Sequence, residues 1–173
     1  MEIILRKWQI SDVNSLAENI NNINIWNNMR DYLPYPYTEK DAKEFIEMVL
    51  TKPDPAIDLA IDIDGNAVGG IGIILKQDVE RICAEMGYWL GEKYWNMGIM
   101  TEAIKQMTNY VFTNFSLHKV YALPFDFNIA SHKVLQKAGY IKEATLRQAA
   151  IKNGIINDLY YYSIIKDKMP NND

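Results

Sequence analysis

The sequence predicts an α+β fold, and three observations support this prediction. Stretches with apolar residues at helical spacing alternate along the chain with stretches in which apolar residues recur at every second position. The dipeptides Asp64-Gly65 and Asn153-Gly154 are typical of hairpin turns. The elements follow the order strand, helix, helix, three strands, helix, strand, helix and two strands. We therefore expect a central mixed, mostly antiparallel, twisted sheet of about seven strands flanked by about four helices.

Hydrophobic periodicity and turn signals give the approximate bounds of these elements. The strands are expected at residues 2–8, 57–63, 67–75, 80–90, 118–123, 140–149 and 155–166. The helices are expected to begin at Ser11 or Asp12, at Thr38, after Gly98, and at Asn128 or Ser131.

Local signals define several of these boundaries. Asn side chains compete for backbone hydrogen bonds, so the first helix should break in the Asn-rich run 19–28. Thr38 and Asp41 form a capping-box pattern before the second helix. Residues 57–63 alternate between apolar and polar positions, which predicts a strand with one solvated face. Gly139 is a typical residue at the end of the last helix.

Composition limits the classes of function. The 173 residues are 49% hydrophobic, which fits a single domain over residues 1–173. A formal net charge of −4 argues against non-specific nucleic-acid binding and suits a cationic substrate better. One cysteine, Cys83, excludes an internal disulfide, and with two histidines it cannot form a His/Cys zinc site. We expect no metal cofactor.

The sequence also predicts the cellular location. No stretch is apolar over the length of a membrane span, and the first ten residues lack the pattern of a secretory leader. We therefore expect a soluble, cytoplasmic protein that does not bind membranes and is a monomer or homodimer.

A strand, a short turn and a long helix follow one another over residues 79–110. The turn contains Asn96 and Gly98, two residue types that adopt positive φ more readily than others. The free amides at the start of the helix and its dipole favour a phosphate or pyrophosphate. The pattern alone is weak, because many such turns bind nothing.

Several stretches, in their order and spacing, resemble one family over nearly the whole chain. They are LPYPYT at 33–38, AEMGYWL at 84–90, GIMTEA at 98–103 and NIASHKVLQKAGY at 128–140, followed by Arg147, Gly154 and Asp158. The sequence resembles the GNAT N-acetyltransferase superfamily, and within it the ribosomal-protein N-acetyltransferase branch. The resemblance implies the GNAT fold and acetyl-CoA as cosubstrate.

The resemblance also implies the residues that contact acetyl-CoA. In the family, this loop has six positions: Gln or Arg, then Gly, any residue, Gly, any residue, and finally Gly or Ala. In this sequence, the residues from Trp95 to Met100 occupy these positions. Asn96 replaces a Gly, and the bulky Met100 would crowd the pyrophosphate. The expected cofactor-binding residues are Trp89, Leu90, Trp95, Asn96, Met97, Gly98, Met100, Thr101, Asn128 and Lys133. Trp89 also fits a core position, and Lys133 a solvated helix surface.

Two residues are candidates for catalysis. An amine must lose a proton before it attacks a thioester, and a carboxylate can accept that proton. Glu85 provides a carboxylate on the strand predicted at residues 80–90. The resemblance implies that Glu85 is the general base and that Ser131 is the acid that protonates the departing thiolate, because Leu135 occupies the place of the tyrosine used by many GNAT members. Glu85 could instead be a solvated strand residue, and Ser131 a helix cap.

Acceptor contacts are expected from the irregular segment before the second helix and from the last hairpin. The candidates are Trp26, Tyr32, Tyr35, Tyr37 and Arg147. Aromatic rings suit a cationic amine, and they are equally compatible with plain loop packing. Arg147 could bind a substrate carboxylate or hold Asp158 across the hairpin.

We expect His132 on the surface and no acyl-enzyme on Cys83.

The resulting hypothesis is an acetyl-CoA-dependent N-acetyltransferase that works by direct attack in a ternary complex. The expected acceptor is a protein or peptide N-terminal α-amine, such as that of a ribosomal protein. One alternative is a small amine such as a polyamine or an aminoglycoside. Another is a non-catalytic CoA-binding or sensing module.

Overall fold

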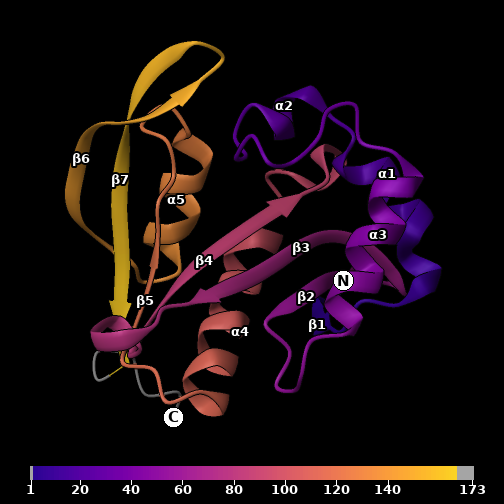
Figure 1. Cartoon of the computed structure of the whole chain (residues 1–173), viewed down its shortest axis with the longest axis horizontal. Helices are drawn as coiled ribbons and strands as arrows, with labels where there is room; N and C mark the ends of the chain where they lie inside the picture. Colours follow the sequence, from indigo (N-terminus) through magenta and orange to yellow (C-terminus); the bar gives the residue numbers. More distant parts are fainter. Residues whose placement is uncertain (1, 167–173) are drawn as a thin grey trace. The chain divides into compact units, whose positions relative to one another are not determined.

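The structure is a computed structural model that describes residues 2–166 (Figure 1). Its strands are β1 (Ile4–Arg6), β2 (Asp58–Ile63), β3 (Asn66–Leu75), β4 (Cys83–Leu90), β5 (Lys119–Ala122), β6 (Ile141–Lys152) and β7 (Ile155–Ile165). Its α-helices are α1 (Val13–Ile20), α2 (Ile23–Trp26), α3 (Glu39–Leu50), α4 (Ile99–Asn114) and α5 (Ile129–Lys137). Short 3₁₀ turns are η1 (Ile10–Asp12), η2 (Asp78–Glu80) and η3 (Glu92–Tyr94).

In the described part of the chain, seven strands are hydrogen-bonded in the order β1-β2-β3-β4-β5-β7-β6. The pairs β1–β2, β2–β3, β5–β7 and β6–β7 are antiparallel, whereas β4 and β5 are parallel. A parallel pair needs a crossover connection, and α4 provides it. The predicted α+β class and the mixed, mostly antiparallel sheet are therefore confirmed.

One helix was not predicted. The first helix ends at Ile20, as the Asn-rich run indicated, but the single turn α2 follows it. The side chain of Asn22 accepts hydrogen bonds from the amides of Asn24 and Ile25 and so caps α2. Asn residues that weaken a helix interior thus start a new turn here, and residues 2–166 contain five α-helices.

The described residues form two compact units. Unit 1 comprises residues 2–72 and 88–103, and unit 2 comprises residues 73–87 and 104–166. The expectation of one domain over residues 1–173 stays a prediction, and residue 1 and residues 167–173 lie outside the described part. Within residues 2–166, no helix is long and apolar enough to cross a membrane.

In unit 1, α1 lies beside α3 (Figure 1). The predicted capping box is present, because Thr38 and Asp41 each accept a hydrogen bond from the other's amide. Buried apolar side chains join these helices in one core: Trp8, Leu16, Ala17, Ile20, Ile25, Tyr37, Ala42, Ile46, Ala60 and Ala67.

The prediction that β2 has a solvated face is wrong. Ala60 is fully buried, and Asp62 is only 4% exposed. Arg6 explains the buried carboxylate, because its Nε donates to Asp62 at 2.7 Å while its other nitrogens bind Asp12 at 2.7 and 2.9 Å. Asp12, and then Asp62, raise the pKa of Arg6 above its ordinary value. Asp12 precedes α1 as predicted, but its side chain binds Arg6 and the amide of Gln9 rather than the helix amides.

In unit 2, β6 and β7 form a long hairpin (Figure 1). Asn153 and Gly154 both have positive φ at its turn, as the sequence indicated. Strand alternation separates two faces of β4, β5 and β7. One face consists of buried residues: Ala84, Met86, Val120, Ala122, Tyr162 and Ile164. The hydroxyl of Tyr140 links this face to α4, because it contacts Thr108 Oγ1 at 2.8 Å and Met86 Sδ at 3.8 Å.

The ion-paired cluster around Arg6 gives a testable prediction for stability. Arg6→Ala should lower the free energy of unfolding by roughly 3 kcal/mol, because it leaves two buried carboxylates without their cation. Urea unfolding at neutral pH measures this change. Lys7→Ala is the matched control, since its exposed pair with Asp54 contributes less than about 1 kcal/mol. Equal losses in both variants would contradict the prediction.

Candidate active site

The second face of β4, β5 and β7 carries polar and aromatic side chains. We call it the polar face, and it consists of Cys83, Glu85, Lys119, Tyr121, Tyr161 and Ser163. The strand registers align these residues: Cys83 is opposite Lys119, Glu85 is opposite Tyr121, and Tyr121 is opposite Ser163. The predicted base Glu85 therefore lies among ionisable and aromatic groups rather than on a bare solvated strand.

Glu85 forms an ion pair with a lysine that sequence analysis did not single out. Lys76 Nζ lies 3.2 Å from Glu85 Oε2, and the two side chains are 28% and 22% exposed. The same Nζ lies 5.6 Å from the centre of the Tyr121 ring. The Tyr121 hydroxyl and then the Glu85 carboxylate outweigh partial burial and raise the pKa of Lys76. The ammonium of Lys76 is thus held between a carboxylate and an aromatic ring.

A second lysine on the polar face has a similar environment. Lys119 Nζ lies 2.8 Å from Glu143 Oε2 and 5.0 Å from the centre of the Tyr161 ring. Burial opposes the charge of Lys119, but the hydrogen bond to Glu143 and nearby charges raise its pKa overall. Glu143 also accepts a short hydrogen bond from the Ser163 hydroxyl. The carboxylate of Glu143 is therefore fixed from two sides.

The start of α5 places the predicted acid. Asn128 is the helix cap, and its side chain accepts a hydrogen bond from the amide of Ser131 at 3.1 Å. Asn128, not Ser131, fills the capping role, so the cap alternative for Ser131 is wrong. The side chain of Ser131 is buried, with an exposure of 8%. Lys133 is exposed on the same helix.

His132 is not a surface residue, in contrast to our expectation. It is 7% exposed, and its ring stacks near Tyr160 and Tyr162 at 4.8 and 5.6 Å. Its Nε2 lies 2.9 Å from the carbonyl oxygen of Asp126. Because a carbonyl only accepts, Nε2 carries the proton in this contact. The ring partners come from β7, far along the chain, so local sequence offered no signal for this burial.

In unit 1, the predicted phosphate loop has the expected backbone. Asn96 and Gly98 have positive φ, of 62° and 79° respectively, directly before α4. The first amides of a helix have no partner within the helix, so this end of α4 can hold an anion. Trp95 supports the loop, because its Nε1 donates to the carbonyl oxygen of Leu90 at 2.8 Å. These features fit the pyrophosphate of a CoA molecule.

The other predicted cofactor residues differ in exposure. Met100 is 8% exposed and Leu90 is 7% exposed, whereas Met97 is 52% exposed. The side chain of Met100 is buried, and the crowding of a pyrophosphate by its bulk stays a prediction. Trp89 is half-buried against the core of unit 1, and its ring lies where a Cβ at Gly70 would be. Any contact of these residues with a cofactor stays a prediction.

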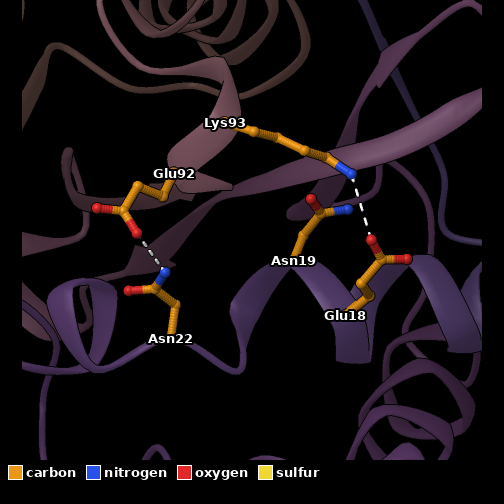
Figure 2. A pocket seen from close by; sticks show the side chains of 5 residues that line it. All are labelled: Glu18, Asn19, Asn22, Glu92 and Lys93. Carbon is orange, nitrogen blue, oxygen red and sulfur yellow. Dashed lines mark hydrogen bonds and ion pairs between the residues drawn. The ribbon is translucent and has the colours of Figure 1, made fainter.

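Next to this loop, unit 1 contains a polar pocket of about 390 Å³ (Figure 2). Figure 2 shows Asn22 donating to Glu92 from one wall and Lys93 paired with Glu18 on the other. Behind them, Asn19 leaves no room for a side chain at Gly91. These contacts join η3 to α1 and to the cap of α2. The contacts between these lining residues therefore hold η3, the segment that leads to Asn96.

The aromatic segment of unit 1 divides into exposed and buried rings. Tyr32 and Tyr35 are 81% and 45% exposed. Trp26 packs near Tyr35, with ring centres 5.8 Å apart, and its Nε1 donates to the carbonyl oxygen of Leu33. Tyr37 is 7% exposed and belongs to the core. Tyr32 and Tyr35 are thus exposed, Trp26 is half-buried and Tyr37 is buried, and contact of these rings with an acceptor stays a prediction.

Arg147 is exposed on β6. One alternative was that Arg147 holds Asp158 across the hairpin. In the structure, Asp158 instead accepts a hydrogen bond from the backbone amide of Gln148 at 2.8 Å. A role of Arg147 in substrate binding stays a prediction.

Comparisons with known proteins identify relatives of the chain. The acetyltransferase (GNAT) domain family matches residues 2–141. The putative ribosomal N-acetyltransferase YdaF of Bacillus subtilis (strain 168) is 31% identical over 110 residues, 64% of this chain and 60% of YdaF. The ribosomal-protein-serine acetyltransferase of Escherichia coli (strain K12) is 29% identical over 99 residues, 56% of this chain and 55% of that protein. The chain thus matches less than two thirds of the length of either relative.

A solved structure is similar along nearly the whole chain. The microcin C7 self immunity acetyltransferase MccE, in complex with acetyl-CoA and AMP, is 25% identical with a TM-score of 0.81. The match covers 95% of this chain and 92% of MccE. The predicted GNAT fold is confirmed.

The placement of Tyr37 can be tested by titration. Burial, and then the charge of Asp41, raises the pKa of Tyr37 to about 12. An ordinary tyrosine has a pKa near ~10, so the stability that depends on neutral Tyr37 is complete below about pH 10 and is lost as the pH rises through about 12. Phenolate absorbance should therefore lose a component near pH 12 in Tyr37→Phe. Tyr32→Phe is the control, because it removes a tyrosine that is 81% exposed; two identical difference curves would contradict the burial of Tyr37.

Proposed function

Because the chain belongs to the acetyltransferase (GNAT) domain family, we propose that it transfers an acetyl group from acetyl-CoA to a primary amine, the N-terminal α-amine of a protein or peptide. The observation that carries this proposal is the position of Glu85 on β4, in register with Tyr121 of β5 and beside an ammonium group. Similarity to YdaF and to the ribosomal-protein-serine acetyltransferase supports a ribosomal-protein type of acceptor.

Glu85 acts as the general base. An α-amine has a pKa near ~8, so most of it is protonated at neutral pH and cannot attack a carbonyl carbon. The Glu85 carboxylate takes this proton, directly or through a water molecule, as the nitrogen forms its new bond. The charge of the carboxylate also attracts the ammonium form of the acceptor before the proton moves.

Acetyl-CoA supplies an activated acetyl thioester. The amides at the start of α4, set up by the positive φ of Asn96 and Gly98, hold its pyrophosphate. The exposed side chains of Trp95 and Met97 flank this loop, and Lys133 is free to approach a phosphate. Asn128 caps the start of α5. It binds the pantetheine arm with the polar side-chain atoms that take no part in the cap.

Ser131 acts at the leaving group. Its hydroxyl donates a hydrogen bond to the sulfur as the carbon–sulfur bond breaks, so that CoA leaves as a thiolate, or it passes the sulfur a proton that Ser131 regains from water, so that CoA leaves as a thiol. A free thiol has a pKa of about 8.5, so a thiolate is already a tolerable leaving group. We therefore assign Ser131 a smaller share of the rate than Glu85.

The aromatic residues Trp26, Tyr32 and Tyr35 contact the acceptor chain beyond its amine. Rings of this kind bind cationic and peptide groups through their faces. An exposed Arg147 pairs with an acidic group of the same acceptor. These contacts distinguish a peptide from a small amine, which is too short to use them.

The proposed activity is tested by measuring CoA release with a panel of acceptors. We expect turnover with peptides that carry a free N-terminal amine, and no turnover with the same peptides after N-acetylation. Turnover with polyamines or aminoglycosides alone would favour a small-amine enzyme. CoA binding in calorimetry without turnover for any amine would favour a sensing module and contradict the proposal.

Substitution of the base gives a second test. Glu85→Gln should lower kcat by roughly 100-fold, with the deficit shrinking at high pH where the acceptor is deprotonated in solution. Glu143→Gln is the matched control, because Glu143 also pairs with a lysine near a tyrosine ring. Full kcat for Glu85→Gln at every pH would show that Glu85 is not the base.

A further inference from the structure

We propose that Glu85 and Tyr121 form an ammonium-binding site, that Lys76 fills this site in the free protein, and that the ammonium of the acceptor displaces Lys76 when it binds. This inference rests on the proposed function and adds a specificity-determining residue to it. It concerns the step before chemistry, in which one cation replaces another and no covalent bond changes.

The geometry of the site is that of a cation receptor. The carboxylate of Glu85 lies 3.2 Å from the nitrogen of Lys76, and the ring of Tyr121 lies within 6 Å of it. The Tyr121 ring is held in place by Tyr161, because the two rings stack with centres 4.8 Å apart and planes 15° apart. A fixed ring and a carboxylate would bind any primary ammonium, whether it belongs to a lysine or to an acceptor.

Lys76 is able to leave the site without disturbing the fold. Its backbone is fixed, since its amide donates to the carbonyl oxygen of Cys83 at 3.1 Å. Its side chain is long, flexible and partly exposed, between the end of β3 and the turn η2. Ion pairs of this exposure are weak, so an incoming cation can compete for Glu85 at little cost.

The raised pKa of Lys76 is consistent with this competition. The Tyr121 hydroxyl and the Glu85 carboxylate keep its nitrogen protonated, so it occupies the site as a full charge at neutral pH. An acceptor that arrives as an ammonium replaces it one for one, and Glu85 is never left without a cation. A neutral or N-acetylated acceptor offers no such replacement. The exchange therefore selects free amines before a proton is transferred.

The chain provides a matched comparison at Lys119. This lysine also lies on the polar face, with a carboxylate at 2.8 Å and a tyrosine ring at 5.0 Å. The two carboxylates differ in their partners. Glu143 accepts a hydrogen bond from Ser163 in addition to its pair with Lys119, whereas within residues 2–166 the side chain of Glu85 accepts its hydrogen bond from Lys76. Removal of Lys119 should therefore not create a free cation site.

The experiment measures trialanine binding to the full chain in the presence of CoA by calorimetry, and the KM for trialanine from CoA release. Lys76→Met should lower both the Kd and the KM for trialanine roughly two- to fivefold, the range that a partly exposed ion pair contributes. The KM for acetyl-CoA should not change. Lys76→Gln should behave like Lys76→Met and serves if the latter folds poorly. Lys76→Arg and Lys119→Met should keep the wild-type Kd.

Two further measurements separate displacement from other roles of Lys76. In a Glu85→Gln background, Lys76→Met should no longer lower the Kd, because the carboxylate for which the two cations compete is gone. N-acetylated trialanine should show no gain with Lys76→Met. An unchanged or higher Kd in Lys76→Met, an equal gain in Lys119→Met, or no binding by wild type and Lys76→Met would each overturn the inference. Absence of turnover with any amine would instead overturn the proposed function, since the Kd comparison needs no turnover.

Discussion

The parallel pairing of β4 with β5 is the constraint on which the candidate site depends. Backbone hydrogen bonds fix Glu85 level with Tyr121, and Cys83 level with Lys119. Two parallel neighbours cannot be joined by a tight turn, so the chain must cross over through α4. That crossover creates the turn at Asn96 and Gly98 as well. The pairing thus fixes the level of the carboxylate and requires a crossover, and in this chain the turn at Asn96 and Gly98 starts the helix of that crossover.

Sequence reasoning succeeded where the physical cause is local. The capping box of Thr38 and Asp41, the cap at Asn128 and the two hairpin turns depend on residues within a few positions of one another. Positive φ at Asn96 follows from the same rule, since Asn tolerates the left-handed region better than larger residues. These signals predict the ends of elements and the loop before α4, while they say nothing about which side chains meet across the sheet.

The errors arise where a partner is distant in sequence. Asp62 occupies a position that alternation marks as solvated, and it is buried because Arg6 of β1 supplies a cation. His132 is buried because two tyrosines of β7 lie against its ring. Lys76 went unnoticed because its importance depends on the register of β4 with β5. In each case the polar group is compensated by a residue that only the folded chain brings near.

The two carboxylate–lysine pairs of unit 2 show how similar groups acquire different properties. Glu143 is held by Lys119 and Ser163, so its carboxylate joins β6 to β5 and β7. Glu85 is held through one flexible lysine whose own backbone is fixed elsewhere. A general base must gain and lose a proton in every cycle, and a carboxylate with several fixed partners resists that change. The carboxylate with fewer fixed partners is therefore the better suited to catalysis, and the more strongly held one is suited to joining β5, β6 and β7.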